Sequence, residues 1–155
     1  MSINQSLCIG CYKPEDMDLG TFARTVADLG FPALEIWFRD ESFEELIEAT
    51  RSAGIRIASM SGHASLGDGL NKESNHDRIE AELEESIDLA AKHGIPGLIC
   101  FSGNRNEGQS DEEGAKVCAE GLKRVAGYAE EKGINLNMEL LNSKVNHPGY
   151  QCDHT

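Results

Sequence analysis

The sequence has few basic residues, with 14 Lys and Arg against 27 Asp and Glu in 155 residues and a formal net charge of −13. Binding to nucleic acid phosphates needs a basic stripe, and an anionic membrane surface likewise attracts basic segments. The charge balance argues against both partners and is typical of a solvated acidic surface. We therefore expect neither a nucleic acid nor a membrane as a partner.

Long apolar runs are also missing, and no basic segment precedes an apolar run at the N-terminus. The pattern predicts neither a membrane-spanning helix nor a signal peptide. The five cysteines are an odd number without a disulfide-like spacing, which fits a reducing compartment. We expect a cytoplasmic protein, and the length of 155 residues predicts a single domain over residues 1–155.

Cys8 and Cys11 form a CxxC motif, but the sequence has no second CxxC motif. A structural zinc site of this type needs two such pairs. We place both cysteines in a first strand over residues 5–12, where residues three apart point to opposite faces. The motif is therefore interpreted as two small strand residues and not as a zinc or redox site.

What the sequence does have is four glycines that each separate a helical pattern from an apolar run, at Gly30-Phe31, Gly54-Ile55, Gly94-Ile95 and Gly133-Ile134. Glycine tolerates the left-handed conformation found just after a helix. A short connection then leads into a buried strand. Together with an opening strand, the four junctions predict five strands and four helices in alternation, which is typical of a parallel α/β sheet.

The expected strands cover residues 5–12, 33–38, 55–61, 95–101 and 134–141. The first helix is predicted over residues 18–29. Capping boxes at Ser42–Glu45 and Ser110–Glu113 mark the starts of the second and fourth helices. The third helix carries an apolar stripe at a spacing of four residues, formed by Ile79, Leu83, Ile87 and Ala91.

Two architectures fit this alternation. In a (β/α) barrel the strand-to-helix loops form the active face, and here the polar loop over residues 62–74 is long while the helix-to-strand links are tight. A doubly wound sheet usually has a phosphate loop after its first strand, and Gly10–Pro14 is neither GxGxxG nor a P-loop. Spacing alone leaves both open. A whole barrel needs about 250 residues, so the chain is too short for a complete one.

Glu139 is the strongest candidate for a catalytic residue. It follows the alternating pattern of the fifth strand, where Asn135, Asn137 and Glu139 share the polar face. A buried carboxylate is costly unless it is paired or bound to a metal. Catalytic groups of barrels lie at the C-terminal ends of strands, where Glu139 is predicted. The alternative is a structural salt bridge.

Three residues of earlier strands are further candidates. His63 follows the third strand at the same end of the sheet as Glu139, where it either binds a substrate hydroxyl or caps a loop. Trp37 belongs either to the core, its commoner place, or to the floor of a substrate pocket. Glu35 shares a face with Trp37 and is expected to form a hydrogen bond with the surrounding structure.

The C-terminal segment 142–150 is predicted to be a loop from its composition. Because it directly follows the glutamate strand, Lys144, His147 and Tyr150 are possible substrate contacts, although a solvated loop is the simpler interpretation. The spacing of His147, Asp153 and His154 fits no fixed metal-ligand pattern.

Several segments resemble the hydroxypyruvate isomerase family of the xylose-isomerase-like TIM barrel superfamily. They are Ser61–His63, Asp68–Asn71, Asn75–Ile79, Met138–Lys144 and His147–Tyr150. The resemblance covers the whole chain but only about the first five strands and four helices of the family's (β/α)8 TIM barrel. It therefore implies that residues 1–155 are the N-terminal part of such a barrel.

The resemblance also implies a reaction. Family members interconvert hydroxypyruvate and tartronate semialdehyde through a cis-enediolate, using two glutamates that often also bind a divalent metal, Mg²⁺ or Mn²⁺. Glu139 matches the first glutamate and is the candidate catalytic residue and metal ligand. His63 matches a position near the substrate, and Trp37 and Lys144 are included as candidate substrate-binding residues.

The family's later strands supply the second glutamate, an aspartate and a histidine or glutamine, and this chain has no matching positions. The metal site is therefore expected to be incomplete, and the 155-residue chain alone is expected to be inactive. An open half-barrel exposes a sheet edge, so we expect a homo-oligomer. The alternatives are a ketose 3-epimerase, a non-catalytic truncated barrel, and a DNA repair nuclease, against which the net charge argues.

Overall fold

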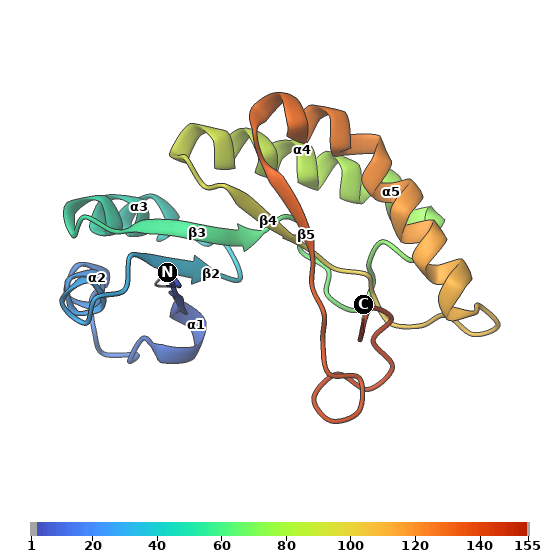
Figure 1. Cartoon of the computed structure of the whole chain (residues 1–155), viewed down its shortest axis with the longest axis horizontal. Coiled ribbons are helices and arrows are strands. Elements are labelled where there is room, and N and C mark those ends of the chain that lie inside the picture. Colours follow the sequence, from blue (N-terminus) through green and yellow to red (C-terminus); the bar gives the residue numbers. More distant parts are fainter. Residues whose placement is uncertain (1–2, 155) are drawn as a thin grey trace.

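A computed structural model describes residues 3–154, which form one five-stranded parallel sheet in the order β1-β2-β3-β4-β5 (Figure 1). The strands are β1 (Ser6–Cys8), β2 (Ala33–Ile36), β3 (Arg56–Ser61), β4 (Gly97–Cys100) and β5 (Asn135–Met138). The helices are α1 (Ile9–Tyr12), α2 (Leu19–Asp28), α3 (Phe43–Ser52), α4 (His76–His93) and α5 (Asp111–Lys132), with a 3₁₀ turn η1 (Glu73–Asn75) before α4.

The strand order decides between the two architectures that the sequence left open. A doubly wound sheet places its first strand inside the sheet, next to a reversal of strand order. Here each strand lies beside its neighbour in sequence, and every pair is parallel. The chain therefore folds as a partial (β/α) barrel, as the resemblance implies.

The hydrophobic core lies between the sheet and helices α2 to α5, which pack on one face of it in Figure 1. The strands contribute alternate apolar residues to this core, because successive side chains of a strand point to opposite faces. Core-facing strand residues are Leu34, Ile36, Ile57, Met60, Leu98 and Cys100. Ile57 and Met60 lie three residues apart because the pairing register of β2 and β3 shifts between Ile57 and Ser59. The opposite face keeps the polar residues Glu35, Ser59 and Asn137.

The glycine junctions behave as predicted. Gly94 and Gly133 are the C-cap residues of α4 and α5 and have φ angles of 71° each. Gly30 and Gly54 also have positive φ angles, of 86° and 73°. Only glycine adopts this left-handed conformation without strain, and it reverses the chain into the next strand.

The first strand is shorter than predicted. It ends at Cys8, and residues Ile9–Tyr12 form the helical turn α1. Cys11 is exposed and does not belong to a strand, so placing both cysteines in one strand was wrong. In this turn Gly10 lies directly on Trp37: a Cβ atom at Gly10 would lie 2.9 Å from Trp37 Cε3, so a larger residue does not fit there without a shift.

One capping box is confirmed and the other is wrong. The Ser110 side chain accepts a hydrogen bond from the Glu113 N–H, and Glu113 accepts one from the Ser110 N–H. Ser42 makes no such bond, because its hydroxyl donates to Asp40 Oδ1 at 2.6 Å. In α4 the stripe of Ile79, Leu83 and Ile87 is buried, but Ala90 completes it and Ala91 is exposed.

The two serines form a matched pair for a stability test. Replacing Ser110 by Ala is expected to lower the free energy of unfolding by about 1 kcal/mol, because an orphan backbone N–H of α5 loses its acceptor. The substitution Ser42→Ala is expected to have a clearly smaller effect, since no helix N–H depends on its hydroxyl. Denaturant unfolding of both variants measures the difference. Equal losses of unfolding free energy would contradict the capping role of Ser110.

No helix within residues 3–154 combines the length and the apolar character that crossing a membrane requires.

Candidate active site

Glu139 is the first residue after β5, and its N–H donates to the carbonyl oxygen of Cys100 at 2.9 Å. Its backbone thus continues the ladder between β4 and β5 beyond the strand end. The side chain lines a pocket of about 320 Å³ on the face of the sheet opposite the helices. The lining residues are Glu35, Trp37, Phe38, Leu66, Ile99, Phe101, Glu139, Leu141 and His147. This is the end of the sheet at which barrel enzymes keep their catalytic groups.

Burial raises the pKa of the Glu139 carboxyl, and the charge of Glu35 raises it further, while His147 acts in the opposite direction. A carboxylate in partly apolar surroundings loses hydration, which favours its neutral form. A general acid–base group works best when its pKa lies near the operating pH. The surroundings of Glu139 therefore shift its pKa in the direction that proton transfer requires.

Glu35 comes from β2 and faces the same pocket. Its neighbour in β1 is Cys8, and the hydroxyl group of Ser6, also in β1, donates a hydrogen bond to Glu35 Oε1. This confirms the expected hydrogen bond of Glu35 with the structure. The bond holds one carboxylate oxygen of Glu35 against β1. Glu35 is on β2 and Glu139 follows β5, so strands β3 and β4 lie between the two glutamates.

The coupling between the two glutamates has a direct test. Replacing Glu35 by Gln removes a negative charge without changing the shape of the side chain, so the pKa of Glu139 is expected to fall. The titration of the Glu139 side-chain carboxyl carbon by NMR measures it. Glu41, which is exposed and does not line the pocket, provides the control variant Glu41→Gln. An unchanged Glu139 titration in Glu35→Gln would show that burial alone causes the shift.

His63 follows β3 and is buried, with 3% of its surface exposed. Its Nε2 accepts a hydrogen bond from the Phe101 N–H at 2.9 Å, and burial lowers its pKa to about 4. It does not line the Glu139 pocket. It lines a neighbouring hollow of about 150 Å³ together with Trp37, Phe38, Arg39, Ser61, Gly62, Ala64, Glu82 and Glu85.

The structure separates the other predicted substrate residues. Trp37 is 47% exposed and lines both the His63 hollow and the Glu139 pocket. The interpretation of Trp37 as a residue of the hydrophobic core was therefore wrong. Lys144 is exposed and lines neither hollow, and its role in substrate binding stays a prediction. His147 lies in the Glu139 pocket instead. The sequence signal for His147 was that the segment 142–150 directly follows the glutamate strand.

The segment 142–153, here called the C-terminal strap, is only in part the solvated loop that its composition indicates: residues 144–146 are exposed, but Tyr150 and Gln151 are buried. Tyr150 is completely buried, and its hydroxyl oxygen accepts a hydrogen bond from the Ser102 N–H at 3.0 Å. The Gln151 N–H donates to the carbonyl of Gly103 at 2.9 Å, and the Leu141 N–H donates to the carbonyl of Cys152 at 3.1 Å. These bonds fix the strap that carries His147 to the loop after β4.

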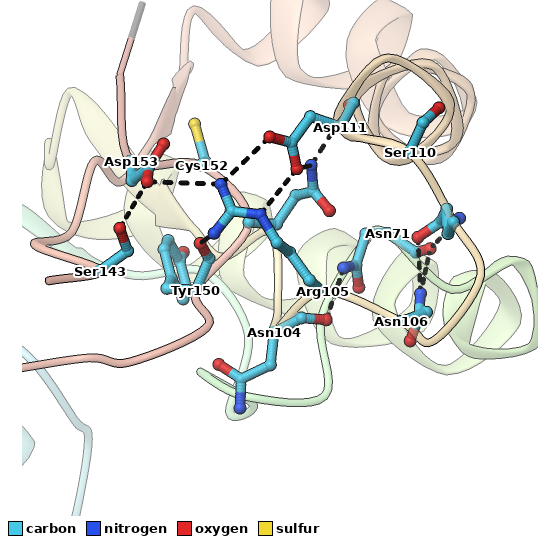
Figure 2. A network of polar contacts seen from close by, with 12 residues as sticks. Asn71, Asn104, Arg105, Asn106, Ser110, Asp111, Ser143, Tyr150, Cys152 and Asp153 are labelled. Carbon is cyan, nitrogen blue, oxygen red and sulfur yellow. Dashed lines mark hydrogen bonds and ion pairs between the residues drawn. The ribbon is translucent and has the colours of Figure 1, made fainter.

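Arg105 ties the strap to α5, as Figure 2 shows. Its guanidinium group donates to the carbonyl of Tyr150 at 2.5 Å, to Asp111 Oδ1 at 2.6 Å and to Asp153 Oδ2 at 3.3 Å. Hydrogen bonds from Ser143 and His154, together with Arg105, hold the pKa of Asp153 well below its usual range. Arg105 therefore joins the loop after β4 and the start of α5 to the strap, which lies more than forty residues further along the chain.

The loop 62–74 also packs against the loop after β4. Asn71 is fully buried, and its amide donates to the carbonyl of Asn104 at 2.7 Å (Figure 2). A Cβ atom at Gly69 would lie 2.5 Å from the backbone of Phe101 and Gly103, so only glycine fits there. Asn75 and Arg78 each donate to the carbonyl of Asp68 at 3.0 Å. Residues of the Asp68–Asn71 and Asn75–Ile79 motifs thus hold the loop that precedes α4.

The residues that the structure describes do not complete a metal site. Within residues 3–154 no three His, Cys, Asp or Glu side chains converge as metal ligands. Glu35, Glu139 and His147 line one pocket, but their side chains do not converge as ligands. The role of Glu139 as a metal ligand stays a prediction.

A partial parallel barrel with an acidic residue at the end of β5 is the arrangement of a barrel enzyme that carries its site at the C-terminal ends of the strands. The chain belongs to the xylose isomerase-like TIM barrel family, whose model matches residues 23–155.

Among curated proteins, the chain is 26% identical over 138 residues to a Streptomyces coelicolor protein named "Putative hydroxypyruvate isomerase", covering 80% of this chain and 49% of that protein. Among solved structures it is similar to a D-psicose 3-epimerase, with a TM-score of 0.69 and 21% identity over 94% of this chain and 55% of that one. An AP endonuclease, family 2, from Brucella melitensis has a TM-score of 0.77 and 15% identity, covering 94% and 58%.

The chain thus spans about half the length of the relatives that it matches. The structural similarities lie below 25% identity and show the fold alone. The family is therefore shown, while the activity, the substrate and the reaction are matters for proposal.

Proposed function

We propose that the chain supplies the first half of the active site of an isomerase that interconverts hydroxypyruvate and tartronate semialdehyde. The observation that carries the proposal is the position of Glu139 at the C-terminal end of β5, in a pocket where burial and Glu35 raise its pKa. The similarity to the Streptomyces coelicolor protein supports the choice of substrate.

In this reaction Glu139 takes a proton from the hydroxymethyl carbon next to the keto group and produces a cis-enediolate. Return of a proton to the former keto carbon, with proton exchange between the two oxygens, gives the aldehyde without any external oxidant. A carboxylate whose pKa is raised by its site is suited to both proton removal and proton return. Trp37, Ile99 and Phe101 form the apolar wall that limits access of water to the enediolate.

A ketose 3-epimerase is the second candidate, and one observation favours it. Within residues 3–154 the lining of the Glu139 pocket contains two carboxylates, Glu35 and Glu139, and neither Lys nor Arg. Hydroxypyruvate is an anion and would be repelled by these carboxylates, while a ketose is neutral. The described half of the site therefore suits a neutral sugar. The charge of the half that the other strands of the barrel supply decides between hydroxypyruvate and a ketose as the substrate.

Product analysis tests the proposal. A protein that contains this chain together with the remaining strands of the barrel is incubated in D₂O with tartronate semialdehyde or with a ketohexose, and products are followed by NMR. We expect hydroxypyruvate from the first substrate, with deuterium on the carbon that was reprotonated. Deuterated epimer from the ketohexose alone would establish the second candidate, and no exchange with either substrate would refute both.

We also propose that the 155-residue chain alone is inactive. The family that it resembles uses a second glutamate as acid–base group, and this chain has no residue that matches it. Strands β1 and β5 each pair with a single neighbour in the described sheet, which leaves two open edges. Open edges favour association with another chain, so we also propose a homo-oligomer. Light scattering after size exclusion measures the mass in solution, and a monomer at high concentration would contradict the association.

A further inference from the structure

The CxxC motif of Cys8 and Cys11 has no part in the proposed reaction, and its placement differs from the one that the sequence suggested. Cys8 ends β1 and is the N-cap residue of α1, with φ and ψ angles of −76° and 117°. Cys11 is the third residue of α1. The chain therefore passes from a strand into a helical turn within the motif. This is the setting in which a CxxC motif carries out thiol chemistry, and the reason for excluding that chemistry no longer holds.

The helical turn brings the two cysteine side chains together. N-cap and N3 side chains face each other in a capping box, and Cys8 and Cys11 occupy these two positions. Cα atoms three residues apart in a helical turn lie about 5 Å from each other. That separation is within the range of about 4.4–6.8 Å that a disulfide spans.

The titration of Cys8 agrees with this geometry. Burial raises the pKa of the Cys8 thiol, and the side chain of Cys11 raises it further through a hydrogen bond and its charge, while the backbone N–H groups of Gly10 and Cys11 act in the opposite direction. The Cys11 thiol is therefore a direct neighbour of the Cys8 thiol.

The two thiols differ in their access to solvent. Cys11 is exposed, so an external reagent reaches it, whereas Cys8 is only partly exposed. An accessible thiol with a second thiol beside it is the usual arrangement of a cysteine pair that responds to oxidants. Because α1 has only four residues, its dipole adds little, and the reactivity depends on exposure and on the neighbouring thiol.

The other cysteines are less suited to this chemistry. Cys100 and Cys118 are buried, and burial raises the pKa of each thiol to about 12. The thiolate is the reactive form, so both are inert at neutral pH. Cys152 is half-buried, and burial raises its pKa as well. Among residues 3–154, Cys11 is thus the one exposed cysteine.

A metal ion fits this thiol pair less well than a disulfide does. A structural zinc site has four ligands. Within the part of the chain that the structure describes, no three His, Cys, Asp or Glu side chains converge as ligands. Glu35 pairs with Cys8 in the sheet, but its carboxylate accepts the hydrogen bond of Ser6. A disulfide needs only the two sulfur atoms that the turn already brings together.

We propose that Cys8 and Cys11 form a reversible disulfide, with a low-molecular-weight disulfide as the oxidant. The Cys11 thiolate attacks one sulfur of the oxidant, which forms a mixed disulfide and releases a first thiolate. The Cys8 thiolate then attacks the Cys11 sulfur and displaces a second thiolate. The two protons of the protein thiols pass to the released thiolates, and the oxidant takes up two electrons. An excess of small thiol reverses both steps. This modification does not depend on the proposed function.

The disulfide lies beside the wall of the Glu139 pocket. Gly10, between the two cysteines, lies against Trp37: a Cβ atom there would lie 2.9 Å from Trp37 Cε3 and 3.2 Å from Cζ3. Trp37 lines the pocket. A bond that closes the turn around Gly10 therefore acts on the Trp37 side chain. Trp37 is the single tryptophan of the sequence, so its fluorescence reports on this contact alone.

Peptide mapping tests the disulfide. The 155-residue chain is equilibrated with glutathione and glutathione disulfide, quenched in acid, alkylated and cut after Lys and Arg. Cys8 and Cys11 remain together in residues 1–24, because Pro14 blocks cleavage after Lys13, and each other cysteine lies in a separate peptide. We expect residues 1–24 to lose two hydrogen atoms and to regain them in excess glutathione. Alkylation of both cysteines at every ratio, or a disulfide between Cys118 and Cys152 instead, would overturn the proposal.

Serine variants separate the roles of the two thiols. Cys8→Ser is expected to accumulate a glutathione adduct on Cys11, because no second thiol displaces it. Cys11→Ser is expected to slow oxidation of this segment by about 10-fold or more, because the remaining thiol is only partly exposed. Cys152→Ser removes another half-buried thiol and is the matched control, expected to leave the disulfide unchanged. Equal behaviour of the three variants would contradict the assigned roles.

Zn²⁺ and fluorescence complete the test. Protection of both reduced thiols from alkylation by equimolar Zn²⁺ would identify a metal site and refute the disulfide. The emission of Trp37 is expected to fall on oxidation, because a nearby disulfide quenches an indole ring, and to recover on reduction. Cys11→Ser is expected to remove this dependence. Constant emission in a chain whose disulfide is established by mapping would refute the link to the Glu139 pocket.

Discussion

Replacing Glu139 by Gln is expected to lower kcat by about 10²- to 10⁴-fold, the usual contribution of a positioned acid–base group. Glutamine keeps the size of the side chain but neither accepts nor returns a proton. The measurement is turnover of tartronate semialdehyde, and of a ketohexose, by a protein that carries this chain together with the remaining strands of the barrel. Glu131→Gln, a change on the exposed side of α5, is the control and is expected to leave turnover unchanged. Unchanged kcat in Glu139→Gln would remove the catalytic role.

The same substitution has a predictable effect on stability. Because the pKa of Glu139 is raised in the folded chain, the folded state binds more protons than the unfolded state at pH values between the two pKa values. The free energy of unfolding therefore falls as the pH rises through this window above the ordinary value of 4.5, and the penalty persists at neutral pH. Glu139→Gln is expected to raise the stability of the 155-residue chain at neutral pH, with little effect at pH values below the window.

Denaturant unfolding at several pH values checks this second expectation and needs no catalytic activity. A variant that gains stability while losing turnover behaves as expected for an active-site carboxylate held in unfavourable surroundings. A variant that loses stability at neutral pH would indicate that Glu139 takes part in a structural ion pair, the alternative that the sequence left open.

Replacing Tyr150 by Ala is expected to lower the free energy of unfolding by about 3–5 kcal/mol, the usual cost of deleting a large buried aromatic side chain. Tyr150 has no exposed surface and anchors the C-terminal strap to the loop after β4. Loss of this anchor is expected to free the strap and with it His147. Chemical denaturation measures the stability, and amide hydrogen exchange over residues 142–153 reports the release of the strap.

Two further tyrosine variants sharpen this result. Tyr12→Ala is the control, because Tyr12 is 66% exposed and its loss is expected to change stability within about 0.5 kcal/mol. Tyr150→Phe keeps the ring and removes the hydroxyl oxygen that accepts from the Ser102 N–H. Ser102 is 1% exposed, so its N–H is left without an acceptor, and a loss of about 1–3 kcal/mol is expected. Equal effects of Tyr150→Ala and Tyr12→Ala would contradict the anchoring role.

The alternation of strands and helices was predictable because its signals are local. A glycine such as Gly94 or Gly133 ends a helix through its own backbone conformation, whatever packs around it. The capping box of Ser110 and Glu113 likewise involves residues of a single helical turn. The position of Glu139 at the end of β5 followed from the period of two in one strand.

The capping box at Ser42 failed for a local reason, the bond to Asp40, but two other errors fall where a distant segment decides the local structure. The helical turn that contains Cys11 forms where Gly10 lies on Trp37, a residue of another strand-to-helix loop. Tyr150 is buried because it lies beside Ser102 and Arg105, which are more than forty residues away in the sequence. Composition describes the strap as a polar loop, and no pattern within the strap reveals these partners.

By itself the sequence determined the five strands, the four long helices, their order, and the polar end of β5 that carries Glu139, since each depends on interactions within one helix, one strand or one turn. Only the tertiary structure decided that the strands pair in sequence order and that Glu35 and His147 share a pocket with Glu139. It also decided that the turn between Cys8 and Cys11 lies against Trp37. These features depend on contacts between segments that are far apart in the chain, and such contacts leave no periodic signal in the sequence.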